Sequence, residues 1–235
     1  TLSSSSAASD VYKRQELKVG TKKSHTAAEN TAFVKSFLRG VVSKESYRTL
    51  VSDLYFVYVA LEEEFRIFKN DPILGALYLP ELERVVALET DLRYYFGPIW
   101  RSIVKPSEQC QRYVDRIHEV AKTEPELLIG HHYTRYLGDL SGGQILKGIA
   151  QKALNLKDEG LSFYEFNKID DAKIYKEKYR SILDKLPLTD SQQNAIITEA
   201  NYAFRLNMYM FDTLEGNSLT SFCKIIMGFI RSKLT

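Results

Sequence analysis

Apolar residues recur along most of the chain at intervals of three and four positions, the spacing of one face of an α-helix. Alternating apolar and polar runs bounded by turn residues, which would indicate strands, are nearly absent. One helix is expected between Glu16 and Leu38, before Gly40. Four of its residues follow one another at intervals of four and share one face: His25, Glu29, Phe33 and Phe37. The pattern predicts an all-α protein.

The same spacing predicts more helices, separated by glycine, proline or Asn-Asp turns. They are expected over 43–70, 81–95, 108–123, a segment that starts near Pro125 and contains several glycines, 167–186, and from Asp190 to about residue 216. No break in composition marks a boundary within the 235 residues, so a single domain is expected.

Composition narrows the class of protein. The chain is 44% hydrophobic and 26% charged, as in soluble globular proteins, and its net charge of +2 lacks the basic field that nucleic-acid binding needs. The apolar stretch Phe222–Ile230 is shorter than the ~20 residues of a membrane helix, so no membrane anchor is expected. Two cysteines without CxxC spacing fit a reducing compartment. Residues 1–15 are Ser-rich and are expected to form a disordered tail, either a transit-peptide remnant or a non-native extension.

A glycine-rich segment, YTRYLGDLSGGQILK, lies inside one expected helix, although each glycine there costs about 1 kcal/mol relative to alanine. Its LSGGQ string matches the signature of ATP-binding-cassette proteins, but no phosphate-binding GxxxxGK[ST] loop occurs, which excludes that class. Gly138, Gly142 and Gly143 fit either tight helix packing or close approach of the backbone to a flat ligand. Asp139 favours a ligand; the alternative is an ion pair with Arg135 one turn earlier.

Among the four histidines, His25 is the best candidate metal ligand, because Glu29 lies one turn on and can orient the imidazole. A histidine on an apolar stripe is more often a structural residue. Two basic clusters occur at near-helical spacing and are either solvated faces or a clamp for carboxylates: Lys18 and Lys22, and Lys173, Lys176 and Arg180. One ligand histidine, an exposed helix backbone and carboxylate-binding cations together indicate haem.

Four segments carry a specific resemblance to a known family: KVGTKKSHTAAEN, LYFVYVALEEE, TEPELLIGHHYTRYLGDLSGGQILKGIAQKAL and KIYKEKYR. From about residue 17 to 226 the chain resembles haem oxygenase, in the soluble form of cyanobacteria and algal plastids. The resemblance implies one all-α catalytic domain over 16–235, with 1–15 outside it. Haem b would lie between a proximal helix and a kinked distal helix.

The resemblance also implies roles for individual residues. His25 would be the proximal ligand of the haem iron, with Glu29 beside it, while the three glycines would let the distal helix lie against the haem. Asp139 would anchor an ordered-water network on the distal side, supported by Tyr58, Arg135 and Asn207. Five residues would lie near the haem propionates: Lys18, Lys22, Tyr133, Lys176 and Arg180.

The family's reaction uses haem as both cofactor and substrate. Oxygen and electrons from a reductant convert it to biliverdin, carbon monoxide and ferrous iron, with the IX-alpha isomer expected. Since the chain lacks the C-terminal anchor of animal members, the expected electron donor is a soluble ferredoxin. The expected location is the bacterial cytoplasm or the plastid stroma. The competing interpretation is a haem carrier or sensor that does not degrade haem, and an unrelated helical hydrolase is a more distant one.

Overall fold

The computed structural model describes the backbone of residues 3–157 and 159–232 and the side chains of residues 16–214 other than residue 158. Every regular element in that part of the chain is helical, which confirms the all-α prediction. The α-helices are α1 (Ser3–Glu29), α2 (Ala32–Leu38), α3 (Lys44–Ile67), α4 (Val85–Phe96), α5 (Trp100–Ile103), α6 (Glu108–Thr123), α7 (Leu128–His132), α8 (Gly138–Ala153), α9 (Ala172–Lys185) and α10 (Asp190–Ser232). Short turns are η1 (Leu74–Leu77), η2 (Pro125–Leu127) and η4 (Ser162–Tyr164), and η3 (Tyr133–Leu137) is π-helical.

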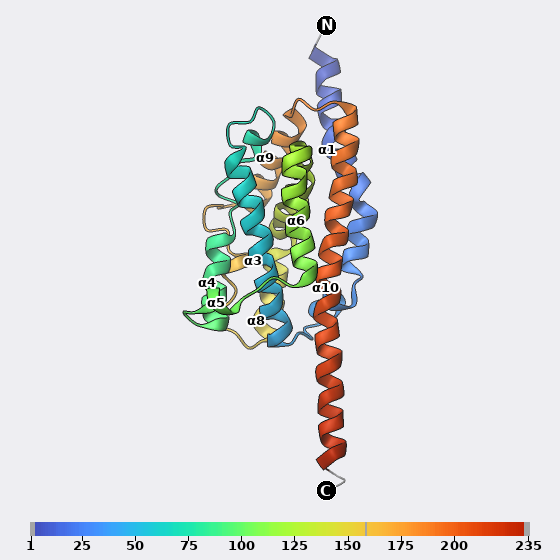
Figure 1. The fold of residues 1–235 in the computed structure, drawn as a ribbon. Coiled ribbons are helices and arrows are strands. Elements are labelled where there is room, and N and C mark those ends of the chain that lie inside the picture. The colour runs from blue at the N-terminus through green and yellow to red at the C-terminus, as the bar shows by residue number, and fades with distance from the viewer. Residues whose placement is uncertain (1–2, 158, 233–235) are drawn as a thin grey trace.

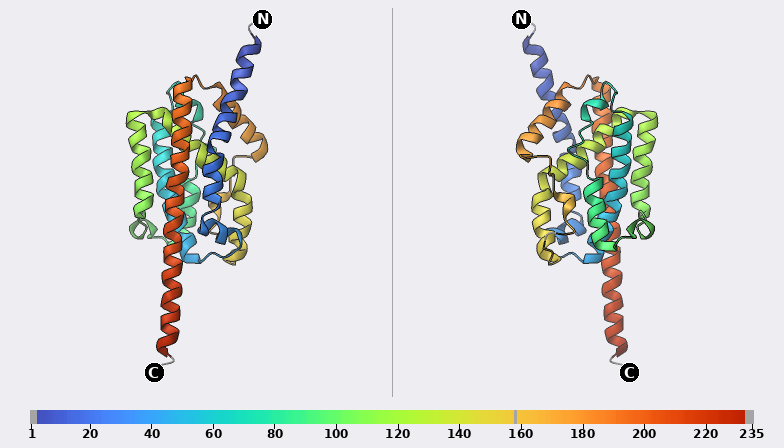
Figure 2. Two further views of the ribbon diagram at one scale, coloured as in Figure 1. Left: turned by 90° about the vertical axis from the view of Figure 1, so that its right-hand side faces the viewer. Right: turned by 90° about the vertical axis from the view of Figure 1, so that its left-hand side faces the viewer.

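The long helix α10 organises the molecule. It contacts α1, α2, α3, α6 and α7, and its C-terminal part extends beyond the other helices (Figures 1 and 2). The N-terminal end of α1 projects from the opposite end of the molecule (Figure 2). Buried aromatic side chains fill the space between the helices, the largest being Trp100, Tyr47, Tyr58, Tyr113 and Tyr179. In the described part of the chain, no helix combines the length and apolar character that crossing a membrane requires.

Several helix boundaries differ from the predicted ones. The helix expected over 16–38 is two helices, because the Thr31 hydroxyl accepts the Val34 N–H and starts α2 anew. The helix expected from residue 81 starts at Val85, and the one expected from residue 167 starts at Ala172, after Asp171 caps it. By contrast, α6 coincides with the predicted residues 108–123. The spacing of apolar residues therefore locates the helices, but the capping residues decide where each helix begins.

The Ser-rich beginning belongs to α1, which is helical from Ser3 onward, whereas a disordered tail was expected. The side chains of residues 1–15 lie outside the described part of the chain. The division into a tail and a catalytic domain over 16–235 therefore stays a prediction.

Two glycines let helices approach α10 closely. A Cβ on Gly130 in α7 would lie 2.8 Å from the Ala200 backbone nitrogen, and a Cβ on Gly20 in α1 would lie 2.6 Å from Ile197 Cγ2. Real Cβ atoms do not approach so closely, so these positions exclude larger side chains. Helices α1 and α7 are thereby packed against the same part of α10.

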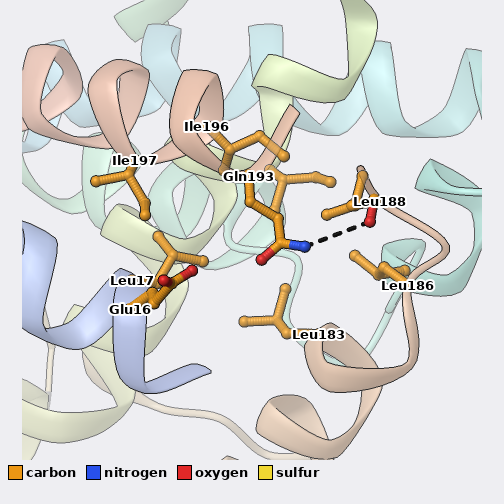
Figure 3. A pocket seen from close by; sticks show the side chains of 9 residues that line it. Glu16, Leu17, Leu183, Leu186, Leu188, Gln193, Ile196 and Ile197 are labelled. Carbon is orange, nitrogen blue, oxygen red and sulfur yellow. Dashed lines mark hydrogen bonds between the residues drawn. The ribbon is translucent and has the colours of Figure 1, made fainter. Parts of the chain in front are cut away.

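A small apolar cavity lies where α1, α9 and α10 meet (Figure 3). Its volume of ≈ 20 Å³ is enough for about one water molecule. The Gln193 side chain borders it and donates to the Leu188 carbonyl at 3.3 Å. None of the candidate site residues lines this cavity, so it belongs to the packing of the helix ends.

Candidate active site

Asp139 lies in the first turn of α8 and its side chain is 13% exposed. The Tyr58 hydroxyl of α3 donates to Asp139 Oδ2, and Arg135 Nη2 lies 3.3 Å from Asp139 Oδ1. The ion pair with Arg135 that the sequence offered as an alternative is therefore present. It is buried, however, and it is one contact of a larger network.

Arg135 joins the other members of this network. Its Nε donates to the Tyr58 hydroxyl at 3.2 Å, and its Nη1 donates to Asn207 Oδ1 of α10 at 2.6 Å. The Asn207 amide group donates to the Ala203 carbonyl at 2.8 Å, which fixes its orientation. Four residues predicted to act together, from α3, η3, α8 and α10, are thus connected by hydrogen bonds: Tyr58, Arg135, Asp139 and Asn207.

Burial dominates the electrostatics of the network. It raises the pKa of Asp139, and the positive charges of Arg135 and Arg84 and the hydrogen bond from Tyr58 oppose that rise only in part. The pKa of the Tyr58 phenol is raised well above its usual value, also by burial. Tyr58 therefore stays a neutral donor, while the Asp139 carboxyl has the increased proton affinity expected of a group that transfers protons.

A π-helical turn over Tyr133–Leu137 separates α7 from α8. Such turns contain one more residue than an α-turn, bend the helix and are frequent at functional sites. The Thr134 hydroxyl satisfies the Gly130 carbonyl at 2.8 Å within this segment. The turn ends directly before Gly138, so it sets the direction in which Asp139 and the glycines face.

The glycines of α8 have different surroundings. A Cβ on Gly138 would meet nothing within 4 Å, and one on Gly142 would meet only Leu146 Cδ1 at 4.0 Å. A Cβ on Gly143 would lie 3.6 Å from Tyr164 Cδ1, and Gly143 is buried. Space for a ligand therefore adjoins Gly138 and Gly142, whereas Gly143, also predicted to face haem, is packed against protein.

A Gly138→Ala substitution should have opposite effects on stability and on haem binding. The haem-free protein should gain about 1 kcal/mol of unfolding free energy, because alanine favours the helix and its methyl group meets no protein atom. Haem affinity should fall, since the methyl group enters the space proposed for haem. Urea unfolding and Soret titration measure the two effects.

Gly148→Ala is the matched control for this prediction, because a Cβ on Gly148 also meets nothing within 4 Å. It should stabilise the protein by a similar amount and leave haem affinity unchanged. Equal haem affinity of both variants and the wild type would show that Gly138 does not face the haem.

His25 lies on α1 with its side chain 56% exposed, available to a ligand that approaches from outside. Its Nδ1 lies 3.6 Å from Glu29 Oε1, and its ring meets the ring of Phe204 of α10 edge-on at 5.7 Å between centroids. Next to it, the Ser24 hydroxyl donates to Asn201 Oδ1 at 2.5 Å, which ties this turn of α1 to α10. Glu29 thus lies on the Nδ1 side of the imidazole, as in ligand histidines whose Nε2 binds the metal.

The other three histidines are engaged in the interior or on the surface of the bundle. Each has a close partner: His118 with Glu64 at 2.6 Å, His131 with Glu199 at 2.9 Å, and His132 with the Tyr179 hydroxyl at 2.7 Å. Burial lowers the pKa of His132 to about 3, so it stays neutral. These partners favour His25 as the candidate ligand.

The candidate propionate residues lie on α1 and α9, which pack against each other, and on η3. Burial raises the pKa of Tyr133, while a hydrogen bond with Thr21 of α1 and the positive charge of Arg180 of α9 act in the opposite direction. Tyr133 therefore lies between the two basic helices. The remaining predicted residues are exposed or half-buried on those helices: Lys18, Lys22 and Lys176.

Sequence reasoning missed Phe204 and Arg84. Phe204 could have been found, because it precedes Asn207 by three positions and so shares its face of α10. Arg84 had no local signal. It is 5% exposed, stacks at 3.7 Å on the Phe166 ring and donates to the Glu165 carbonyl at 2.6 Å, and its charge acts on Asp139 from 55 positions away in sequence (139 minus 84).

Glu62 supports this region from α3. It is 6% exposed, and its Oε1 accepts the backbone N–H groups of Arg84 at 2.5 Å and Val85 at 3.0 Å, at the start of α4. Burial raises the pKa of Glu62 to about 7 despite these two hydrogen bonds. The Glu62 carboxyl of the folded protein therefore stays protonated at pH values where the same carboxyl of the unfolded chain is ionised.

We expect Glu62→Gln to change how stability depends on pH. The folded pKa exceeds the unfolded one, so the wild type loses stability as the pH rises from about 4.5 to about 7. Glutamine keeps an acceptor oxygen without this cost. The unfolding free energy of the variant relative to wild type should rise by about 3 kcal/mol between pH 4 and pH 8. Denaturant unfolding at both pH values tests this, and parallel pH profiles would contradict it.

Comparisons with known proteins agree with this geometry. The Heme oxygenase family profile matches residues 13–213. Heme oxygenase 1 of Synechocystis is 58% identical over 202 residues, covering 86% of this chain and 84% of its own, and heme oxygenase of Porphyra purpurea is 52% identical over 217 residues, covering 92% of each chain.

Solved structures give the same result. The crystal structure of heme oxygenase-1 from Synechocystis in complex with heme superposes with a TM-score of 0.89 at 54% identity, covering 93% of this chain and 99% of that chain. The Synechocystis heme oxygenase-2 structure with heme and NO has a TM-score of 0.85 at 48% identity, covering 87% and 85%. With this profile match, these identities and the shared fold, the chain belongs to the heme oxygenase family.

Proposed function

We propose that this protein cleaves haem b with oxygen to biliverdin, the IX-alpha isomer, carbon monoxide and ferrous iron, using electrons from reduced ferredoxin. The observation that carries the proposal is the buried Asp139 carboxyl, hydrogen-bonded by Tyr58 and Arg135 beside the open face of Gly138. Two further features fit haem: the exposed imidazole of His25 and the space next to Gly138 and Gly142. Membership of the heme oxygenase family supports haem degradation as the outcome.

We assign iron and propionate binding to one group of residues and proton transfer to another. When bound, haem supplies the iron at which oxygen is activated. His25 would hold the iron, with the Glu29 carboxylate near its Nδ1 and the Phe204 ring edge-on beside it. Tyr133, Arg180 and neighbouring lysines would bind the propionates and so orient the haem. That orientation would decide which edge of the macrocycle faces the reaction.

Asp139 delivers a proton through ordered water. Its raised pKa lets the carboxyl hold a proton, and Tyr58 and Arg135 fix the direction of its oxygens. The open face of Gly138 and Gly142 would leave room for oxygen and water beside the substrate. Asn207 keeps the Arg135 guanidinium oriented. Together these groups limit protonation to a defined position.

This network favours an enzyme over a haem carrier or sensor. A carrier needs the ligand histidine and the propionate clamp, but it gains nothing from a buried acid on the oxygen side. Burying Asp139 costs free energy that Arg135 and Tyr58 only partly offset, as the raised pKa indicates. Such a cost is typical of a catalytic site.

The proposed electron donor is a soluble acidic ferredoxin, and the proposed location is a bacterial cytoplasm or a plastid stroma. Exposed lysines of α1 and half-buried basic residues of α9 would surround the haem edge: Lys18, Lys22, Lys176 and Arg180. Docking through such charges speeds association and weakens with ionic strength.

One reaction tests the proposal. The protein is mixed with haemin, ferredoxin, ferredoxin reductase and NADPH under air, and absorbance is followed. The Soret band should decay as biliverdin appears, and the rate should fall as salt is added. A persistent Soret band with no biliverdin, with either ferredoxin or a chemical reductant, would favour the carrier.

A further inference from the structure

The side of α8 opposite the open glycines contacts the short segment that contains Tyr164 and Glu165. At about 100° per residue, Gly142 lies about 40° from Gly138 around the helix axis, whereas Lys147 lies about 180° away. Lys147 Nζ lies 2.6 Å from Glu165 Oε1, and Gln144 Nε2 donates to the Tyr164 carbonyl at 3.0 Å. Gly143, which lies on the same side of the helix, packs on the Tyr164 ring.

That segment is itself rigidly held. The buried Asp91 carboxylate of α4 accepts the backbone N–H groups of Ser162 and Phe163, both at 2.8 Å. Arg84 donates to the Glu165 carbonyl, and the Tyr95 hydroxyl donates to the Gly160 carbonyl at 2.9 Å. Residues 160–165 therefore form a fixed support, anchored to α4 and to the start of that helix.

The helix on this support is intrinsically weak. Four of its residues are glycines, Gly138, Gly142, Gly143 and Gly148, which together disfavour the helix by about 4 kcal/mol relative to alanine. A π-helical turn precedes it, so regular α-helical hydrogen bonding does not run unbroken from α7 into α8. Contacts with a fixed neighbour therefore have a large share in deciding where the glycine face lies.

We infer that Gln144 and Lys147 are positioning residues, which hold α8 against residues 164–165 and so set the distance of the glycine face from the substrate. We call these two contacts the α8 latch. The role rests on the proposed haem cleavage only where substrate is concerned, because the latch is a property of the haem-free protein as well. Both side chains contact protein on the side of α8 away from Gly138 and Gly142, so they act through the helix backbone.

Hydrogen–deuterium exchange of the haem-free protein tests the latch without any turnover. Lys147→Met should increase exchange of the amides of residues 138–147 about threefold, the effect of losing a partly exposed ion pair. Adding Gln144→Leu should bring the increase to about tenfold. The charge-exchanged variant Lys147→Glu with Glu165→Lys should restore exchange toward the wild-type rate.

Lys178→Met is the matched control, since it breaks a similar ion pair, 3.1 Å to Glu81, that does not involve α8. It should leave exchange in α8 unchanged. Wild-type exchange in both latch variants, or no recovery in the charge-exchanged variant, would overturn the latch, whether or not the protein degrades haem.

A second measurement reports on position rather than stability. If wild type forms biliverdin, the double variant should yield a changed ratio of biliverdin isomers, with kcat altered more than KM, because the glycine face meets the substrate at a different distance. An unchanged isomer ratio in a variant with faster exchange would reduce the latch to a purely stabilising contact and contradict the positioning role. Absence of biliverdin from the wild type would refute the proposed function but not the exchange result.

Discussion

Asp139→Ala should bind haem with near-normal affinity yet form biliverdin at least about 100-fold more slowly than the wild type, the usual contribution of a positioned proton donor. The carboxyl is the member of the network that titrates, and its removal leaves Tyr58 and Arg135 without their shared acceptor. His25 on the other side is untouched, so the iron ligand remains. Soret titration measures binding, and absorbance during turnover measures biliverdin.

Asp139→Asn separates proton transfer from shape. Asparagine keeps an oxygen that accepts from Tyr58 but cannot hold the proton, so it should be nearly as slow as alanine while disturbing Arg135 less. Circular dichroism and urea unfolding of both variants confirm that the fold is retained. Normal biliverdin formation by either variant would refute the proposed proton role of Asp139.

His25→Ala should abolish the spectrum of histidine-ligated ferrous haem and, with it, biliverdin formation. The imidazole is exposed on α1, and the other three histidines are engaged with partners elsewhere, so none should replace it as a ligand. The helix should survive, because alanine favours it and the removed side chain is not part of the core. Resonance Raman of the ferrous iron–histidine stretch and a turnover assay are the measurements.

His118→Ala is the matched control, because it too removes a histidine that lies close to a glutamate, Glu64 at 2.6 Å. It should leave the haem spectrum and turnover intact. An unchanged axial ligand in the His25 variant would mean that another histidine binds the iron, and the assignment would have to move.

The sequence predicts those features of the structure that depend on neighbouring residues, and not those that depend on contacts between distant ones. Periodicity is local, so the all-α class and the exact limits of α6 follow from it. The start of a helix that is set by a tertiary contact does not follow from periodicity. Glu62 of α3 caps α4 from 22 positions away, and no residue between 81 and 85 indicates that contact.

The candidate site divides in the same way. That Asp139 and Arg135 interact follows from helical spacing, and the convergence of Tyr58 and Asn207 on them agrees with the resemblance to the family. The π-helical turn could not be predicted, because its extra residue depends on how α7 and α8 pack, as the close approach of Gly130 to α10 illustrates. The separation of Gly143 from the two open glycines likewise depends on Tyr164, which lies 21 positions later (164 minus 143).

The π-helical turn at Tyr133–Leu137 also constrains how this protein can evolve. Deleting one residue from it would restore an α-turn and remove the bend between α7 and α8, changing the direction of α8 and moving Asp139 relative to Tyr58. An insertion that the turn does not absorb would rotate α8 by about 100° about its axis. Functional descendants of this sequence should therefore accumulate substitutions between His132 and Gly138 but no change in length, and chain length in this interval distinguishes active enzymes from degenerate copies.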